Sequence, residues 1–260
     1  MDQIQEINIK SFHPNLINPT LQNYKDSSVG GTKIVVIGKA NTGKSTLIKY
    51  LMASKSDIIP TCMVVSGTED SNKFYSSFVP NIFIHDHYSD HNMQNIIKRQ
   101  KISLNYLEPE AVWSLLLLDD CTEDRKIFNS PTQQALYKNG RHWKLFYILS
   151  LQHATDVPPA IRTNMDSVFI FRETNENNLI SIYKNYASVI PKFDLFKQIM
   201  QQVTGDYTAL YIDNTSQDNN WVNNVYWFKA PYSDNGMGDV RFGCDEAWKY
   251  NRERCAYTEP

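Results

Sequence analysis

The sequence predicts an α/β protein with a mainly parallel central sheet, helices on its flanks and a C-terminal β-hairpin, and three observations support this. Short apolar runs alternate with segments of helical length through the middle of the chain. A glycine-rich segment at residues 38–46 joins the first apolar run to the first helical one. A leucine run ends in two carboxylates, Asp119 and Asp120. Strands that alternate with helices favour a parallel sheet covered on both faces.

Composition sets the limits on function. The 260 residues are 42% hydrophobic and 12% aromatic, which is ample for a sizeable core. No apolar stretch is long enough to span a membrane and no signal sequence is evident, so we expect a protein that stays inside a cell. The four scattered cysteines fit neither a zinc ribbon nor a disulfide framework. A net charge of −2 argues against a uniformly basic, DNA-coating surface, although a local basic track remains compatible with it.

The first elements are the most clearly patterned. Residues 1–32 are polar and contain Pro14 and Pro19, so we expect an arm that lies over the core rather than a long helix. Residues 33–37 (KIVVI) form a β-branched run that is typical of a fully buried parallel strand. In residues 45–54 the apolar positions follow the spacing of an amphipathic helix.

The rest of the chain continues the alternation. Further apolar runs, most of them expected strands, lie at 62–65, 82–84, 112–118, 145–151 and 168–171, and helices are expected at 90–107, 125–138, 175–186 and 192–203. Residues 208–212 and 224–229 form the expected closing hairpin. Residues 231–260 show no clear period and are interpreted as a tail or as a segment that orders on a partner. The predicted organisation is an arm (1–32), a main domain (33–230) and a tail (231–260).

The segment from Gly38 to Ser45 matches G-x-x-x-x-G-K-S/T, the phosphate-binding loop known as Walker A. It follows a predicted buried strand and opens a predicted helix, so backbone N–H groups and the helix N-terminus converge on phosphates. Lys44 is expected to reach the β and γ phosphates, Ser45 to bind Mg²⁺, and Thr46 to assist near the α phosphate. The predicted ATP-binding residues are Gly38, Lys39, Ala40, Asn41, Thr42, Gly43, Lys44, Ser45 and Thr46.

The leucine run that ends at Asp119 and Asp120 has the Walker B pattern. Two adjacent carboxylates at the end of a buried strand are costly unless a cation or a reaction uses them. Asp119 is expected to hold Mg²⁺ directly or through water, and Asp120 to orient or deprotonate the attacking water. A guanine-reading segment and an arginine-rich lid are both missing from the sequence, which argues against a GTPase and a small-molecule kinase. The predicted fold is therefore a P-loop NTPase of the ASCE, RecA-like type.

Two further polar residues flank the apolar run 145–151. Gln152 follows its end, where an amide can sense the γ phosphate if this strand lies between the two Walker strands. Arg141 precedes its beginning, far from the nucleotide of its own chain. Such an arginine can serve the site of a neighbouring subunit in a ring, although an ordinary surface arginine has the same spacing.

With these residues in hand, the chain resembles the DNA-packaging ATPases of nucleocytoplasmic large DNA viruses, the poxvirus packaging ATPase family within the FtsK/HerA superfamily. The resemblance covers most of the chain and rests on GKANTGKST, LLLLDDC, NGRHWKLFYILSLQHATDVPPAIRTNMDSVFIF, ALYIDNTS and VYWFKA. It implies an ATP-driven motor, a homo-oligomeric ring such as a hexamer or pentamer, that pumps double-stranded viral DNA into a preformed capsid. It also places Arg141, or Arg162 as a second candidate, as the arginine acting in trans.

The same resemblance implies an assembly site in the host cytoplasm, presence in the virion, and contacts with capsid or inner-membrane proteins. A nucleotide-gated assembly protein without DNA translocation is the alternative hypothesis, and a phosphotransferase with a small acceptor is a third. Sustained phosphate release separates the motor from the assembly protein.

Overall fold

The computed structural model describes residues 7–121, 125–231 and 240–255. Its strands are β1 (Lys10–Ser11), β2 (Lys33–Ile37), β3 (Thr61–Ser66), β4 (Ile84–His85), β5 (Ser114–Asp119), β6 (Leu145–Leu151), β7 (Ser167–Ile170), β8 (Thr208–Asp213) and β9 (Val225–Lys229). Its α-helices are α1 (Lys44–Ala53), α2 (Glu69–Asn72), α3 (Asp90–Tyr106), α4 (Pro109–Val112), α5 (Pro131–Asn139), α6 (Pro159–Arg162), α7 (Glu176–Tyr186), α8 (Phe193–Val203) and α9 (Asp245–Cys255). Short 3-10 turns are η1 (Pro14–Leu16), η2 (Tyr75–Ser77), η3 (Asn81–Phe83), η4 (Arg125–Asn129) and η5 (Trp221–Asn224).

The described strands form one sheet with the order β1-β9-β8-β7-β2-β6-β5-β3-β4. The pairs from β7 through β2, β6, β5 and β3 to β4 are all parallel. Only β8 runs against its neighbours, because its pairs with β7 and β9 are antiparallel, and β1 pairs in parallel with β9. The mainly parallel sheet and the closing hairpin predicted from the sequence are confirmed. β6 lies between β2 and β5, as predicted for the strand that ends before Gln152.

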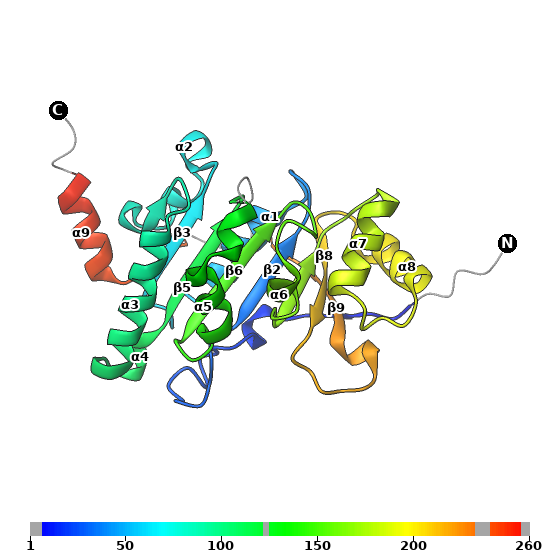
Figure 1. Ribbon diagram of the computed structural model, residues 1–260, viewed down its shortest axis with the longest axis horizontal. Coiled ribbons are helices and arrows are strands. Elements are labelled where there is room, and N and C mark those ends of the chain that lie inside the picture. Colours follow the sequence, from blue (N-terminus) through cyan, green and yellow to red (C-terminus); the bar gives the residue numbers. More distant parts are fainter. Residues whose placement is uncertain (1–6, 122–124, 232–239, 256–260) are drawn as a thin grey trace.

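Burial on both faces explains why the central strands read as continuous apolar runs. In β2, Val35 and Ile37 join the core on one face, while Ile34 and Val36 join the core on the other. Helices α3, α5, α7 and α8 contribute to the first core, and α1 packs into the second. Figure 1 shows the same arrangement, with α3 and α5 in front of the sheet and α1 behind it.

The helix expected at residues 125–138 was wrong in one respect, because the structure splits it into η4 and α5. Ser130 between them is extended, with φ −64° and ψ 147°, since the ring of Pro131 disfavours the helical region for the residue before it. Its hydroxyl caps α5 by accepting from the backbone N–H of Gln133. The apolar run 82–84 is likewise mostly the turn η3, followed by the two-residue strand β4.

The two end segments contain elements that the sequence pattern did not indicate. In the arm, β1 adds an edge strand beside β9, and buried Lys55 donates to the carbonyl of Ile17 at 2.7 Å. In the segment after residue 231, the backbone N–H of buried Phe242 donates to the Phe78 carbonyl, and α9 follows. The predicted arm therefore contributes to the sheet, and the described part of the tail packs on the core.

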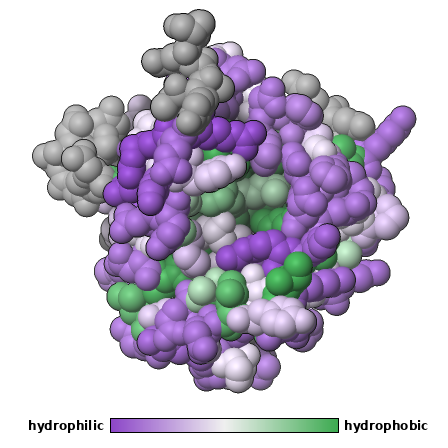
Figure 2. Space-filling model, turned by 90° about the vertical axis from the view of Figure 1, so that its left-hand side faces the viewer, coloured by the Kyte–Doolittle hydropathy of each residue, from purple (hydrophilic) through white to green (hydrophobic). Residues whose placement is uncertain are grey.

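α9 and α3 lie at the left-hand end of the molecule in Figure 1, and Figure 2 shows this end face-on. The surface there is largely hydrophilic, with hydrophobic side chains gathered in a hollow and along its lower part. The end of α3 and the residue after it contribute exposed Ile102, Leu104, Tyr106 and Leu107. Among the described residues, no helix combines the length and apolar character needed to cross a membrane.

Candidate functional site

The carboxyl ends of the parallel strands bring most of the predicted site residues together along one side of the sheet, called here its carboxyl edge. The register pairs Ile37 with Leu151 and Asp119 with Ser150, so the segments that follow β2, β6 and β5 start side by side. They line a cavity of about 890 Å³. Of the predicted residues, the cavity wall contains Lys39, Ala40, Asn41, Gly43, Lys44, Ser45, Thr46, Asp119, Asp120 and Gln152.

Gly38 and Thr42 belong to the same loop but are not part of the cavity wall. A Cβ on Gly38 would lie 2.6 Å from Thr42 Oγ1 and 2.8 Å from Phe171 Cβ, so only glycine fits there. The Thr42 hydroxyl donates to the Lys39 carbonyl at 2.8 Å. Gly43, at φ 105°, is the N-cap of α1 and turns the chain into the helix. The loop is thus wrapped tightly around the open N-terminus of α1, where backbone N–H groups can bind an anion.

Lys44 folds back over this loop. Its ammonium donates to the Gly38 carbonyl at 2.5 Å and to the Lys39 carbonyl at 3.0 Å. Burial lowers the pKa of Lys44, and the negative charges of Asp119 and Asp120 oppose that change. The positive charge therefore lies inside the cavity, close to both carboxylates.

The two carboxylates have different partners. Asp119 is only 8% exposed at the end of β5, and its Oδ2 accepts a 2.7 Å hydrogen bond from the hydroxyl of Tyr75. Burial, reinforced by the Asp119 charge, raises the pKa of Tyr75 far above its usual range, so the phenol stays protonated and acts as the donor. Asp120 has φ 53°, and its Oδ1 accepts from Gln152 Nε2 at 2.7 Å. The amide and the second carboxylate are thereby positioned as a pair.

The oxygen groups of this cavity suit a magnesium ion. Ser45 offers a hydroxyl at the first turn of α1, and Asp119 and Asp120 offer carboxylates from the neighbouring side of the same cavity. Mg²⁺ prefers such oxygen ligands and commonly uses one or two carboxylates together with substrate phosphates. Among the described residues, Tyr75 donates to one carboxylate oxygen of Asp119, and the second oxygen could bind a cation.

Several residues of the cavity wall were missed by sequence reasoning. Thr68 and Asn72 come from the segment after β3, and Asp206, Tyr207, Lys229 and Ala230 come from the ends of β8 and β9. No sequence motif marks these positions; the last four reach the cavity because β8 is antiparallel to both of its neighbours. Tyr75, which holds Asp119, likewise has no local sequence signal.

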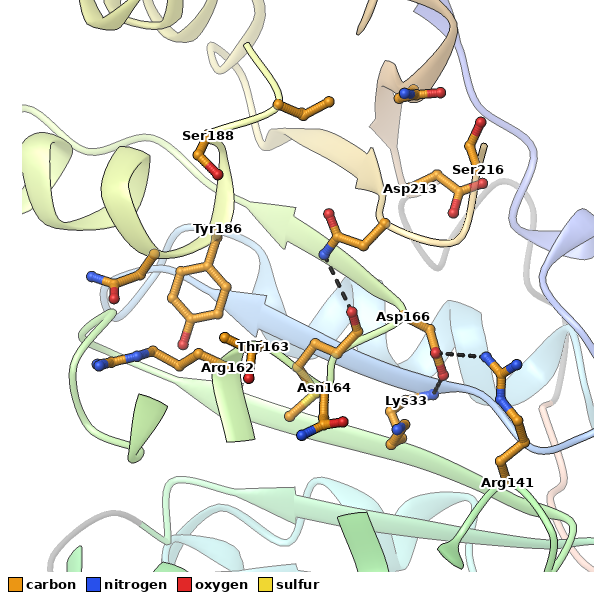
Figure 3. A pocket seen from close by; sticks show the side chains of 15 residues that line it. Lys33, Arg141, Arg162, Thr163, Asn164, Asp166, Tyr186, Ser188, Asp213 and Ser216 are labelled. Atoms are coloured by element: carbon orange, nitrogen blue, oxygen red, sulfur yellow. Dashed lines mark hydrogen bonds and ion pairs between the residues drawn. The ribbon is translucent and has the colours of Figure 1, made fainter. Parts of the chain in front are cut away.

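Arg141 and Arg162 lie elsewhere, in a second cavity of about 700 Å³ that also contains Lys33 and Asp166 (Figure 3). Arg141 Nη2 contacts Asp166 Oδ1 at 2.8 Å, and Asp166 Oδ2 accepts from the backbone N–H of Lys33, the first residue of β2, at 2.8 Å. This cavity therefore lies at the strand beginnings, the edge opposite Asp120 and Gln152. Both candidate arginines share it, although in Figure 3 they approach from different ends.

Comparisons with known proteins give close relatives in viruses. No protein-family model matches the chain. It is 62% identical over 255 residues to "Uncharacterized protein 075L" of Invertebrate iridescent virus 6, covering 98% of this chain and 97% of that protein. It is 46% identical to protein 088R of Invertebrate iridescent virus 3, covering 92% and 91%. It is 40% identical to protein 015R of Frog virus 3, covering 95% and 74%.

Two solved structures share the fold at low sequence identity. The genome packaging NTPase B204 from Sulfolobus turreted icosahedral virus 2, in complex with AMPPCP, has a TM-score of 0.57 and 19% identity, covering 77% of this chain and 98% of that one. The pCW3 conjugation coupling protein TcpA, with ATPgS, has a TM-score of 0.57 and 11% identity, covering 85% and 65%. The chain thus shares the fold of a genome packaging NTPase and of a conjugation coupling protein, an α/β fold with the mainly parallel sheet that the sequence predicted.

Proposed function

This chain belongs to the family that includes 075L of Invertebrate iridescent virus 6, 088R of Invertebrate iridescent virus 3 and 015R of Frog virus 3, and from that premise we propose that it is an ATP-hydrolysing motor that moves double-stranded viral DNA into a capsid during genome packaging. The fold supports the motor class, because B204, a viral genome packaging NTPase, and TcpA, a conjugation coupling protein, share it. In this proposal residues 33–230 are the ATPase domain.

One observation carries the proposal. The cavity at the carboxyl edge brings together a glycine-rich loop, a half-buried lysine, two carboxylates and an amide, which come from the ends of three different strands. If the loop were only a structural turn, the carboxylates of Asp119 and Asp120 beside the ammonium of Lys44 would have no role. A nucleoside triphosphate with Mg²⁺ complements these groups, because its negative phosphates match the loop and the lysine and its cation matches the carboxylates.

The proposed roles follow from this geometry. Lys44 moves from the loop carbonyls to the β and γ phosphates, and the backbone of residues 38–46 binds the phosphate chain. Ser45 and Asp119 hold Mg²⁺, which neutralises phosphate charge when bound. Asp120 accepts a proton from the water that attacks the γ phosphorus, while the bond from phosphorus to the ADP oxygen breaks. Gln152, hydrogen-bonded to Asp120, orients that water or senses the γ phosphate.

Arg141 is the proposed arginine finger that acts on a neighbouring subunit, with Arg162 as the second candidate. Arg141 is held by Asp166 at the opposite edge of the sheet from its own Asp120. An arginine finger supplied in trans raises the rate by about 10³- to 10⁵-fold. Hydrolysis would then depend on assembly of the chain into a ring.

The proposed partners are double-stranded DNA, further copies of the chain, and capsid or inner-membrane proteins of the virion. The proposed location is the host cytoplasm at the virus assembly site, and the virion. With a net charge of −2, contact with DNA requires that a few lysines and arginines gather on one surface of the ring.

Phosphate release, measured with and without double-stranded DNA, tests this function. We expect sustained turnover that DNA stimulates and that Lys44→Ala and Asp120→Asn each abolish. Asp70→Asn is a matched control, because the Asp70 side chain is 77% exposed and is not part of the cavity wall. Turnover that is indifferent to DNA counts against the motor. ATP-dependent assembly without turnover would instead support a nucleotide-gated assembly protein.

A mixing experiment tests the shared site. An Arg141→Ala protein keeps an intact cavity but lacks the arginine, whereas a Lys44→Ala protein keeps the arginine but lacks a working cavity. We expect each protein alone to be inactive and the mixture to recover part of the phosphate release. A mixture as inactive as its components argues against Arg141 in trans, and the same test with Arg162→Ala then examines the second candidate.

A further inference from the structure

Tyr207, the residue before β8, is an exposed aromatic side chain in an unusual backbone conformation. Its side chain and backbone are 64% exposed together, and its φ is 59°. The preceding residue, Asp206, also has a positive φ of 48°. A positive φ is a genuine outlier for a bulky residue and costs on the order of 1 kcal/mol or more. The aromatic ring of Tyr207 is therefore exposed to solvent and is not packed in the core.

The sheet topology places this ring at the nucleotide edge. Since β8 is antiparallel to β7, its beginning lies at the edge where β2, β5 and β6 end. The register pairs Thr208 with Lys229, so the end of β9 lies there as well. Both strands are on the side of β2 that faces away from β5. Tyr207 and Asp119 thus border the same cavity from opposite sides.

Tyr207 also lies directly against the phosphate loop. A Cβ on Gly43 would be 3.3 Å from Tyr207 Cβ and 3.4 Å from its Cδ1. Gly43 is the N-cap of α1, so the ring stands next to the helix end that attracts phosphate. An ion pair between Asp206 and Lys229 ties the turn before β8 to the end of β9. The turn that carries the ring is therefore in contact with the phosphate loop and is connected to β9.

We propose that the Tyr207 ring is the stacking platform for the base of the bound nucleoside triphosphate. This inference rests on the proposed function and adds the subsite for the nucleoside half of the ligand. The terminal phosphates are drawn toward Lys44, at the side of the cavity that carries Asp119 and Asp120. The ribose and base then extend in the other direction, where Tyr207, Lys229 and Ala230 form the wall. The flat face of a phenol accepts any nucleobase by stacking.

Comparing two ligands isolates the base from the phosphates. ATP and inorganic tripolyphosphate both carry the phosphate chain, but only ATP carries a base. Binding of each, with Mg²⁺ present, is measured by calorimetry for the wild type, Tyr207→Ala and Tyr207→Phe. Tyr106→Ala is the control, because Tyr106 is 81% exposed on α3 and lies outside this cavity.

We expect Tyr207→Ala to weaken ATP binding about tenfold or more while tripolyphosphate binding stays within about twofold of wild type. Tyr207→Phe, which keeps the ring, and Tyr106→Ala are expected to bind both ligands normally. Unchanged tripolyphosphate binding by Tyr207→Ala would also show that the phosphate loop of this variant is intact.

Three results would overturn the inference. The first is wild-type ATP affinity in Tyr207→Ala, and the second is an equal loss of both ligands, which would mean that the side chain only supports the loop at Gly43. The third is a wild type that binds ATP no better than tripolyphosphate. A wild type that binds neither ligand would instead overturn the proposed function itself, and the base subsite with it.

Discussion

The hydrogen bond that the Tyr75 hydroxyl donates to Asp119, the carboxylate proposed to bind Mg²⁺, should make a measurable contribution to stability. Tyr75→Phe removes one hydroxyl and leaves the ring in place. The hydroxyl lies 2.7 Å from Asp119 Oδ2, and the two residues are 2% and 8% exposed. A hydrogen bond to a charged group contributes about 1.5–3 kcal/mol, because the charge strengthens it and water cannot replace the lost donor in a buried place. We expect the free energy of unfolding to fall by about this amount.

Urea unfolding without nucleotide or Mg²⁺ measures this change, and a double-mutant cycle with Asp119→Ala isolates the pair. Tyr183→Phe is the matched control, because the Tyr183 hydroxyl donates at 3.0 Å to an uncharged acceptor, the Ile190 carbonyl. The control is expected to cost only about 0.5–1.5 kcal/mol. A coupling energy below about 0.5 kcal/mol, or a Tyr75→Phe cost no larger than that of the control, would refute the reasoning.

Three more predictions concern lysines and their anchors. Burial lowers the pKa of Lys55 to about 8 from 10.5. Between pH 8 and 10.5 the unfolded chain therefore binds one proton more than the folded chain, so the free energy of unfolding should rise with pH across this range by about 3 kcal/mol. Lys55→Met should remove this rise in urea titrations at several pH values. Lys144 Nζ donates to three carbonyls within residues 26–29, so Lys144→Met should speed limited proteolysis of this segment, and equal cleavage rates would contradict the anchoring. Glu173 pairs with Lys39 of the phosphate loop at 2.7 Å. Because Glu173→Gln removes a negative charge beside this loop and frees the charge of Lys39, it should strengthen ATP and tripolyphosphate binding equally, by about two- to fivefold in calorimetry; a change for ATP alone would contradict it.

The central half of the sheet could be predicted because local pattern and tertiary environment agree there. β2 and β6 are buried on every residue, so each reads as an apolar run, broken only by Lys33 and Ser150, with the bounds found in the structure. The loop at 38–46 and the two aspartates could be predicted because chemistry fixes their types and spacing. Parallel strands then place Asp119 and Gln152 beside the loop without further information.

The missed elements depend on contacts that sequence spacing does not encode. β1 is two exposed residues that become a strand only because β9 offers a free edge. α9 carries charges at most positions, so it lacks an apolar stripe from which a helix could be recognised. Tyr75 is 44 residues away from Asp119, and Tyr207 reaches the cavity only because β8 reverses direction. Each requires knowledge of the three-dimensional neighbours.

The length of β6 decides how an arginine could take part in hydrolysis. Gln152 follows the end of this strand and Arg141 precedes its beginning, and the seven residues of β6 alone, at about 3.3 Å each, make roughly 23 Å. No side chain covers that distance, so Arg141 cannot reach the cavity of its own chain. Its partner Asp166 holds it at the edge where β2 and β7 begin. Catalysis by Arg141 therefore requires a second copy whose carboxyl edge faces this amino edge, and a ring of copies in one repeated orientation provides that contact for every subunit.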